Sequence, residues 1–165
     1  IAFGSEDAKF PSLRRKILDK SILDKFFRSN LSVAVGVFDE WIANEDRNIG
    51  NILYGGANTF IFIDHENSKI FDSNPIDSTA TNFILEMISE KLSDKQKIVA
   101  KRKAMEECAA IATKKFDDLE IATHAASYIE KGDIDETIEF LSNRMMHLDA
   151  LIEQKIKSTQ MELNL

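Results

Sequence analysis

The feature that most limits the possible folds of this chain is a pair of short β-forming runs in an otherwise helix-like sequence. Residues 51–63, NILYGGANTFIFI, place β-branched and aromatic residues on either side of Gly55, Gly56, Ala57 and Asn58. Two such runs separated by a few Gly and Asn residues are typical of an antiparallel hairpin. We therefore predict one β-hairpin near the N-terminal third of the chain.

Helical periodicity dominates the segments before the hairpin. Residues 11–29 carry apolar side chains at helical spacing, with Pro11 near the start. The run 31–43 fits both a strand and a helix. We favour a helix, because its apolar pattern continues without a break to Trp41 and Ile42.

From Asp77 to the end, the pattern is helical in about four segments. Ser93 and Asp133 are the expected N-caps of two of them, and Gly132 is the expected stop of another. The predicted fold class is therefore α+β and predominantly helical, in a single domain over residues 1–165. The helical segments are expected at residues 77–92, 94–116, 118–131 and 133–158.

The acidic composition and the single cysteine limit the possible partners. At a net charge of −7 the chain has no overall positive field, so binding to nucleic acid is not indicated. Cys108 excludes an internal disulfide and fits a reducing compartment, which predicts a cytoplasmic protein. No apolar run reaches membrane-spanning length and no signal peptide is visible, so we expect no membrane contact.

Polar side chains gather at the entrance and exit of the predicted hairpin. Asp46 and Asn51 stand at its entrance, and Asp64 ends its second strand in FIFIDHE. Because a hairpin brings its two ends together, we expect Asn51 beside Asp64, with Asp46 over the same spot. Carboxylate and amide oxygens are hard ligands that suit Mg²⁺. Each residue also has a plain structural interpretation, since Asp and Asn side chains commonly cap turns.

The spacing of these residues resembles a known phosphotransferase pattern. Asp46 and Asn51 form Asp-x-x-x-x-Asn, and Asp64 follows Asp46 by eighteen positions. Kinase-like phosphotransferases share this arrangement. Arg47 follows the acid in DRNIGN, and the runs VFDEWIANEDRNIGNIL and FIFIDHE are similar to those of the bacterial HipA-like kinases. AFGS near the start also resembles that family, although the close match covers only about residues 35–66.

The resemblance implies the C-lobe of a protein-kinase-like fold. Residues 1–10 would follow the hinge between lobes, residues 31–66 would form the helix, catalytic loop and metal-binding hairpin, and residues 77–160 would form a helical subdomain. The implied reaction is Mg²⁺-dependent transfer of the γ-phosphoryl group of ATP to a hydroxyl. A protein Ser or Thr is the expected acceptor, while lipid and small-molecule hydroxyls stay open.

The resemblance also gives a role to each matching position. Asp46 would position the acceptor hydroxyl and take its proton, while Asn51 and Asp64 would bind Mg²⁺. Arg47 would either brace the loop and neutralise nearby carboxylates or contact a phosphate. The implied contacts with the adenine of ATP are Leu53 and Ile63.

Departures from the family pattern concern the loop and a whole lobe. Asn48 stands where a His is frequent, which changes how the catalytic loop is held in place. Glu66 stands where a Gly is expected, which adds a negative charge near the metal site. No Gly-rich loop followed by a strand Lys precedes the motif, so the phosphate-covering N-lobe is not in this chain. Either the chain is the C-lobe of a larger protein, or a partner subunit supplies the N-lobe, or the nucleotide site has degenerated. Because the chain opens on Ile1 rather than Met, we favour the first of these. This chain alone is expected to be inactive.

Two other functional classes stay open. One is a catalytically silent kinase-like interaction module, in which the helices after Asp77 bind a partner. The other is a regulator, such as a toxin–antitoxin or phage-defence component. Mg²⁺-dependent ATP binding would separate an active kinase from the first class, and a co-purifying partner would identify the second.

Overall fold

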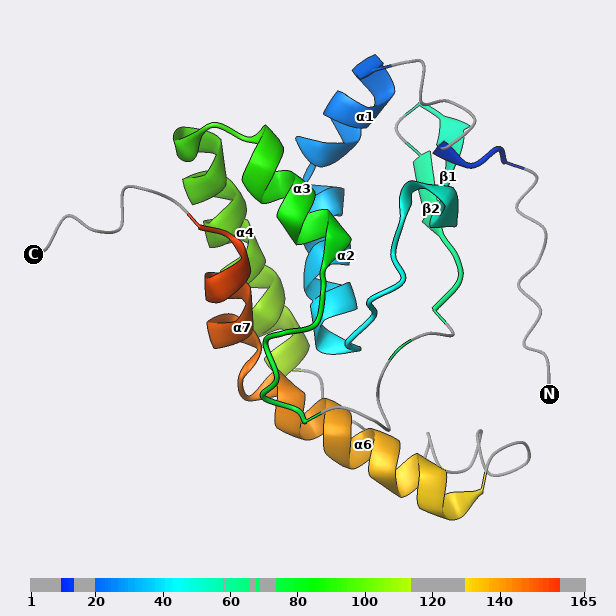
Figure 1. Ribbon diagram of the computed structural model, residues 1–165, viewed down its shortest axis with the longest axis vertical. Helices are drawn as coiled ribbons and strands as arrows, with labels where there is room; N and C mark the ends of the chain where they lie inside the picture. Colours follow the sequence, from blue (N-terminus) through cyan, green and yellow to red (C-terminus); the bar gives the residue numbers. More distant parts are fainter. Residues whose placement is uncertain are drawn as a thin grey trace, which may run out of the picture.

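The structure is a computed structural model that describes residues 10–13, 20–57, 59–65, 68, 74–113 and 130–157. These residues form a mostly helical structure with one two-stranded antiparallel sheet, which confirms the predicted α+β class (Figure 1). The elements in chain order are α1 (Lys20–Phe27), α2 (Asn30–Trp41), the 3₁₀ turn η2 (Ile49–Asn51), β1 (Ile52–Gly56), β2 (Thr59–Phe62), α3 (Phe83–Lys91), α4 (Asp94–Ala112), α6 (Lys131–Met145) and α7 (Leu148–Lys155).

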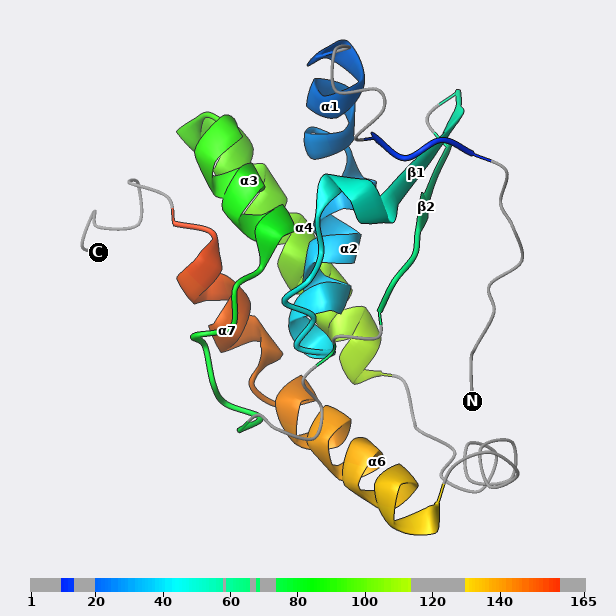
Figure 2. The same cartoon turned by 45° about the vertical axis from the view of Figure 1, so that its right-hand side comes forward.

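Helix α2 lies at the centre of the helical part, and it contacts α1, α3, α4, α6 and α7 (Figure 2). Its apolar residues are buried on several sides, among them Val33 and Val37. This burial explains why the run 31–43 is apolar nearly all round and confirms that it is a helix. Ser29 caps the helix by accepting a hydrogen bond from the backbone N–H of Ser32 over 3.3 Å.

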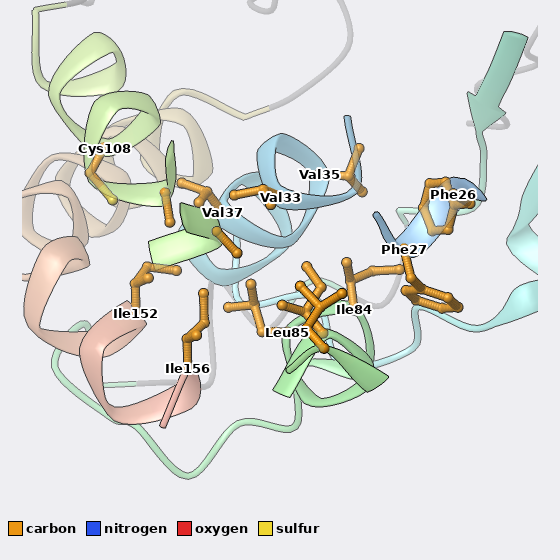
Figure 3. Packing of buried hydrophobic residues seen from close by; sticks show 14 of the residues in the cluster. Phe26, Phe27, Val33, Val35, Val37, Ile84, Leu85, Cys108, Ile152 and Ile156 are labelled. Carbon is orange, nitrogen blue, oxygen red and sulfur yellow. The ribbon is translucent and has the colours of Figure 1, made fainter. Parts of the chain in front are cut away.

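Close packing of α3 on α2 depends on a glycine. A Cβ atom at Gly36 would lie 2.6 Å from Cδ2 of Leu85, so no side chain fits there. The apolar core extends from this contact toward α1, α4 and α7 (Figure 3). Labelled core residues from five helices are Phe27, Val37, Ile84, Cys108 and Ile152.

The hairpin predicted over residues 51–63 is confirmed. Ile52 lies opposite Phe62 and Tyr54 opposite Phe60, and a register shift follows Tyr54. Aromatic contacts join the hairpin to α1: the ring centroids of Phe26 and Phe60 are 5.0 Å apart. The ribbon is therefore anchored to the helices through one of its faces.

The helix predicted over residues 11–29 is wrong at its start. Ser12 forms an isolated antiparallel bridge with Leu53, and the Tyr54 N–H donates to the carbonyl of Pro11 over 3.0 Å. Proline has no N–H to donate, so it suits the outer edge of a sheet, where its carbonyl can still accept. Among the described residues of this stretch, the α-helix is confined to α1.

The helix predicted from Asp77 begins later, at α3. Asn82 caps it by accepting a hydrogen bond from the Leu85 N–H over 3.1 Å. Before this cap, backbone carbonyls are satisfied by a side chain from α6: Nη1 of Arg144 donates to Pro75 over 3.0 Å and to Asp77 over 3.2 Å. The next N-cap, Ser93, is placed as the sequence predicts.

The last predicted helix, 133–158, is two helices. α6 ends at Met145 and α7 begins at Leu148, with a tight turn in which the Met146 N–H donates to Asn143 over 3.2 Å. Both helices contact α2 and α4, and α7 packs along α4 (Figure 1).

Helix α6 also starts earlier than predicted. Its N-cap is Glu130, so Gly132 and Asp133 lie in its first turn instead of acting as a stop and an N-cap. Asp133 still suits that turn, because an acid there complements the positive end of the helix dipole. The predicted post-hinge segment and the predicted helix 118–131 fall almost entirely outside the described residues.

In the described part of the chain, no helix combines the length and the apolar character needed to cross a bilayer.

Candidate functional site

A buried ion pair links the C-terminal end of α2 to the loop that follows it. The Arg47 guanidinium binds the Asp39 carboxylate in a fork, with Nε–Oδ2 and Nη2–Oδ1 distances of 2.9 Å. Both side chains are fully buried. Nδ2 of Asn44 donates a further bond to Asp39 over 3.1 Å. The carboxylate is thus fully engaged and ties the loop to the helix.

Arg47 also reaches the end of the hairpin. Its Nη1 donates to the carbonyl oxygens of Ile63, at 2.7 Å, and Asn51, at 3.4 Å. Its Nη2 lies 2.8 Å from Nδ1 of His65. With the two bonds to Asp39, these contacts occupy all five N–H groups of the guanidinium. Arg47 therefore joins α2, the loop, η2 and the segment after β2.

His65 acts as an acceptor in this network. Since an arginine can only donate, Nδ1 of His65 must accept, and the ring proton then resides on Nε2. Partial burial of the ring, and then the neighbouring Arg47 cation, lower the pKa of His65 below its ordinary value. The ring also packs edge-on against Phe38, with centroids 5.7 Å apart. These contacts make His65 an anchor for the segment after β2.

Asn51 is buried where the loop enters β1. Its Nδ2 donates to the Asp46 carbonyl over 3.1 Å, and its own carbonyl accepts from the Ile63 N–H over 3.1 Å. Because the amide nitrogen is used by the loop backbone, the amide oxygen is the atom that remains for a ligand. The Asn51 backbone thus pairs with Ile63, the residue before Asp64, and the predicted approach of the Asn51 and Asp64 side chains stays a prediction.

Asn48 holds the same part of the loop. Its Nδ2 donates to the Asp46 carbonyl over 3.0 Å, and its Oδ1 accepts from the Gly50 N–H over 2.8 Å, which caps η2. Asn48, which stands where the HipA-like pattern frequently has a His, therefore makes two hydrogen bonds that fix the loop. The departure at Glu66 lies outside the described residues.

Asp46 and Asp64 are both exposed to solvent. Asp64 has a φ angle of 64°, in the left-handed region, which Asp and Asn adopt more readily than other residues that carry a side chain. Here Arg47 holds both neighbours of Asp64, through the carbonyl of Ile63 and the ring of His65.

The described residues contain no cluster of three or more His, Cys, Asp or Glu side chains suited to a metal. The predicted Mg²⁺ site does not require one, because Mg²⁺ commonly takes one or two protein oxygens and completes its shell with phosphate and water. Joint coordination by Asn51 and Asp64 stays a prediction. So do the adenine contacts of Leu53, half-buried on β1, and Ile63, half-buried after β2.

A second buried ion pair, which the sequence analysis missed, lies beside the first. Arg144 of α6 is fully buried; its Nη2 lies 3.0 Å from Oε1 of Glu40, and its Nε donates to the Glu40 carbonyl over 2.6 Å. Nδ2 of Asn82 donates to the other carboxylate oxygen over 3.0 Å. Burial raises the pKa of Glu40 and lowers the pKa of Arg144. The available signal was two consecutive acids inside the apolar run VFDEWIA.

The chain was compared with protein-family models, with curated proteins and with solved structures, and none of these comparisons gives a match. Any assignment of function therefore rests on the residues and on the geometry of the site.

Proposed function

We propose that this chain is the C-lobe of a HipA-like kinase and takes part in transferring the γ-phosphoryl group of ATP to a hydroxyl. The observation that carries the proposal is the hydrogen bond from Asn51 Nδ2 to the Asp46 carbonyl. Arg47 at the same time ties the loop to the segment that leads into Asp64. This arrangement supports the proposal because phosphoryl transfer needs a base and metal ligands held in a fixed relation.

In this proposal the oxygen-bearing side chains have separate roles. Asn51 and Asp64 would hold Mg²⁺, since an amide oxygen and a carboxylate are the hard donors that this cation takes beside phosphate. When bound, Mg²⁺ neutralises charge on the phosphate oxygens. Asp46, exposed beside Asn51, would orient the acceptor hydroxyl and accept its proton. The acceptor we propose is a protein Ser or Thr.

Arg47 is better described as a positioning residue than as a phosphate ligand. Of the two roles that the sequence left open, the bracing role is favoured by the use of all five N–H groups within the protein. A phosphate contact would require Arg47 to leave Asp39 uncompensated inside the protein, which is costly.

We further propose that a second lobe, on the same protein or on a partner subunit, covers the ATP phosphates. The sequence of residues 1–165 contains no Gly-rich loop followed by a strand Lys. Asp46 and Asp64 add negative charge at the site of a chain with a net charge of −7. Phosphates would therefore be repelled unless donors come from elsewhere. Residues 1–165 alone are expected to bind ATP weakly and to transfer no phosphate.

A labelled-phosphate assay tests this proposal. Transfer from γ-labelled ATP to protein is measured for residues 1–165, with and without the N-lobe segment. With that segment, Asp46→Asn should lower turnover by about 100-fold or more, the scale of a lost catalytic base. The control is Asp135→Asn, an equal charge change at an exposed position of α6, which should have no effect.

Turnover by residues 1–165 alone would contradict the need for a second lobe. Absence of turnover in the complete protein would contradict phosphotransfer and would favour the silent interaction module.

A further inference from the structure

An apolar groove is lined by residues of the turn between α1 and α2 and by residues at the start of α4. It has a volume of about 270 Å³, and its floor is built by core residues that are almost fully buried. The groove adjoins the first turn of α2, whereas Arg47 binds Asp39 near its end, about 9–14 Å farther along the helix. The groove is thus separate from the candidate phosphotransfer site. Its floor residues are Phe27, Val33, Leu92 and Ala100.

One side of the groove exposes an apolar side chain to solvent. Val99 of α4 lines the groove and is 66% exposed, and its neighbour Ile98 is 42% exposed. Single exposed apolar residues are common, but Val99 adjoins the apolar floor of the groove. A ligand in the groove would therefore bury Val99 together with surface that is already apolar.

The charged residues that line the groove are positive, whereas the net charge of the whole chain is negative. Arg28 and Lys95 line it, and none of the described residues that line it is acidic. Lys91 is close by, with Nζ 5.8 Å from the centre of the Phe27 ring. In a chain with a net charge of −7, this local excess of cations favours a ligand that carries carboxylates.

We propose that this groove binds a short segment of a partner protein that carries a large apolar side chain next to Asp or Glu residues. The apolar side chain fills the groove against Val99, and the carboxylates face Arg28 and Lys95. Asn30 also lines the groove and can bond the backbone of such a segment, whereas the Ser29 hydroxyl is engaged in capping α2. This surface acts independently of phosphotransfer.

The cations that line the groove, together with its size, favour an acidic peptide over other occupants. A volume of about 270 Å³, at the lower end of the range for ligand pockets, holds one large anchoring side chain, and Arg28 and Lys95 favour the carboxylates that flank it. A stable dimer with a second copy would bury roughly 800 Å² on each partner, far more than the groove provides. A second copy would also bring a further net charge of −7.

The test uses a library of short random peptides selected on the full 165-residue chain, followed by fluorescence anisotropy with an enriched peptide. Enriched sequences should combine a large apolar residue with Asp or Glu. Val99→Glu should weaken binding at least tenfold, and Lys95→Glu should weaken it in a salt-dependent way. The matched control is Met146→Glu: Met146 is 67% exposed, outside the groove, and its substitution should change affinity less than twofold.

Several results would overturn this proposal. They are the absence of any enriched peptide, enrichment of basic peptides, and peptide binding that survives Val99→Glu. Binding of dodecanoate that Val99→Glu abolishes, without peptide binding, would assign the groove to a small amphiphile and would also overturn it. Circular dichroism should show that Val99→Glu and Met146→Glu keep the native helix content. The Asp46→Asn variant should bind the peptide with the same affinity as the unchanged chain. A failure of peptide binding is therefore distinct from a failure of the proposed phosphotransfer.

Discussion

Asp39 and Glu40 are consecutive residues of α2, and their carboxylates bind two different buried arginines. Asp39 binds Arg47 of the following loop, at 2.9 Å, and Glu40 binds Arg144 of α6, at 3.0 Å. Adjacent residues on a helix point about 100° apart, so they can serve two separate faces. The end of α2 thereby connects the candidate site on one side with the C-terminal helices on the other.

The Asp39–Arg47 ion pair should stabilise the whole fold, in addition to holding the loop after α2 in place. Arg47→Met leaves a fully buried carboxylate without its cation, and we expect a loss of about 3–5 kcal/mol in the free energy of unfolding. Urea denaturation measures this loss. The double variant Asp39→Leu/Arg47→Met should recover part of it, because an apolar pair avoids the uncompensated buried charge.

The matched control for this prediction is Arg102→Met. Arg102 pairs with Glu106 on the surface of α4, and its side chain is 84% exposed. Its loss should change the free energy of unfolding by less than about 0.5 kcal/mol. Equal effects of the two substitutions would show that Arg47 is not held in a buried ion pair.

Two Gly→Ala substitutions should change the free energy of unfolding in opposite directions. Gly36→Ala would place Cβ 2.6 Å from Leu85, a fully buried side chain that cannot move aside, and should destabilise the protein by about 1–3 kcal/mol. Gly132→Ala meets no atom within 4 Å in the first turn of α6 and should stabilise by about 0.4–1 kcal/mol. Thermal unfolding of both variants measures these two effects. A Gly36→Ala protein as stable as the unchanged chain would contradict the close approach of α2 and α3.

Cys108 should be unreactive in the folded protein. The thiol is buried on α4, and burial raises its pKa from 9.0 to about 11. At pH 8, iodoacetamide should alkylate it slowly in buffer and readily in urea, as mass spectrometry can show. The thiol of the unfolded chain loses its proton at a lower pH than the thiol of the folded chain. The contribution of Cys108 to the free energy of unfolding is therefore complete below pH 9 and declines as the pH rises toward 11. Rapid alkylation of the native protein would contradict the burial.

Local patterns explain what the sequence predicted correctly. The hairpin follows from two β-forming runs around Gly55 and Gly56, and both strands lie within the predicted range 51–63. The helical choice for 31–43 followed from an apolar pattern that continues to Trp41, which suits a helix buried by several neighbours. Asn51 lies beside the hairpin exit because antiparallel pairing requires it.

Contacts between distant residues explain most of what the sequence did not predict. Glu40 and Arg144 are 104 positions apart, so no spacing rule could pair them. The break after Met145 was missed because the sequence on both sides of it is helix-compatible, so no local pattern marks it. The start of α3 was misjudged because carbonyls near Asp77 bind the Arg144 side chain instead of helix donors.

Broadening of NMR signals by Mn²⁺–ATP tests the central claim most directly, since it detects even weak binding to residues 1–165 alone. We predict that broadening centres on residues 46–51 and 63–65, and that Asp64→Asn abolishes it by removing the charged metal ligand. Asp46→Asn should leave it nearly intact, as should Asp135→Asn, an equal charge change on α6. Broadening centred on the acidic residues of α6, or unchanged by Asp64→Asn, would contradict a metal–nucleotide site at Asn51 and Asp64.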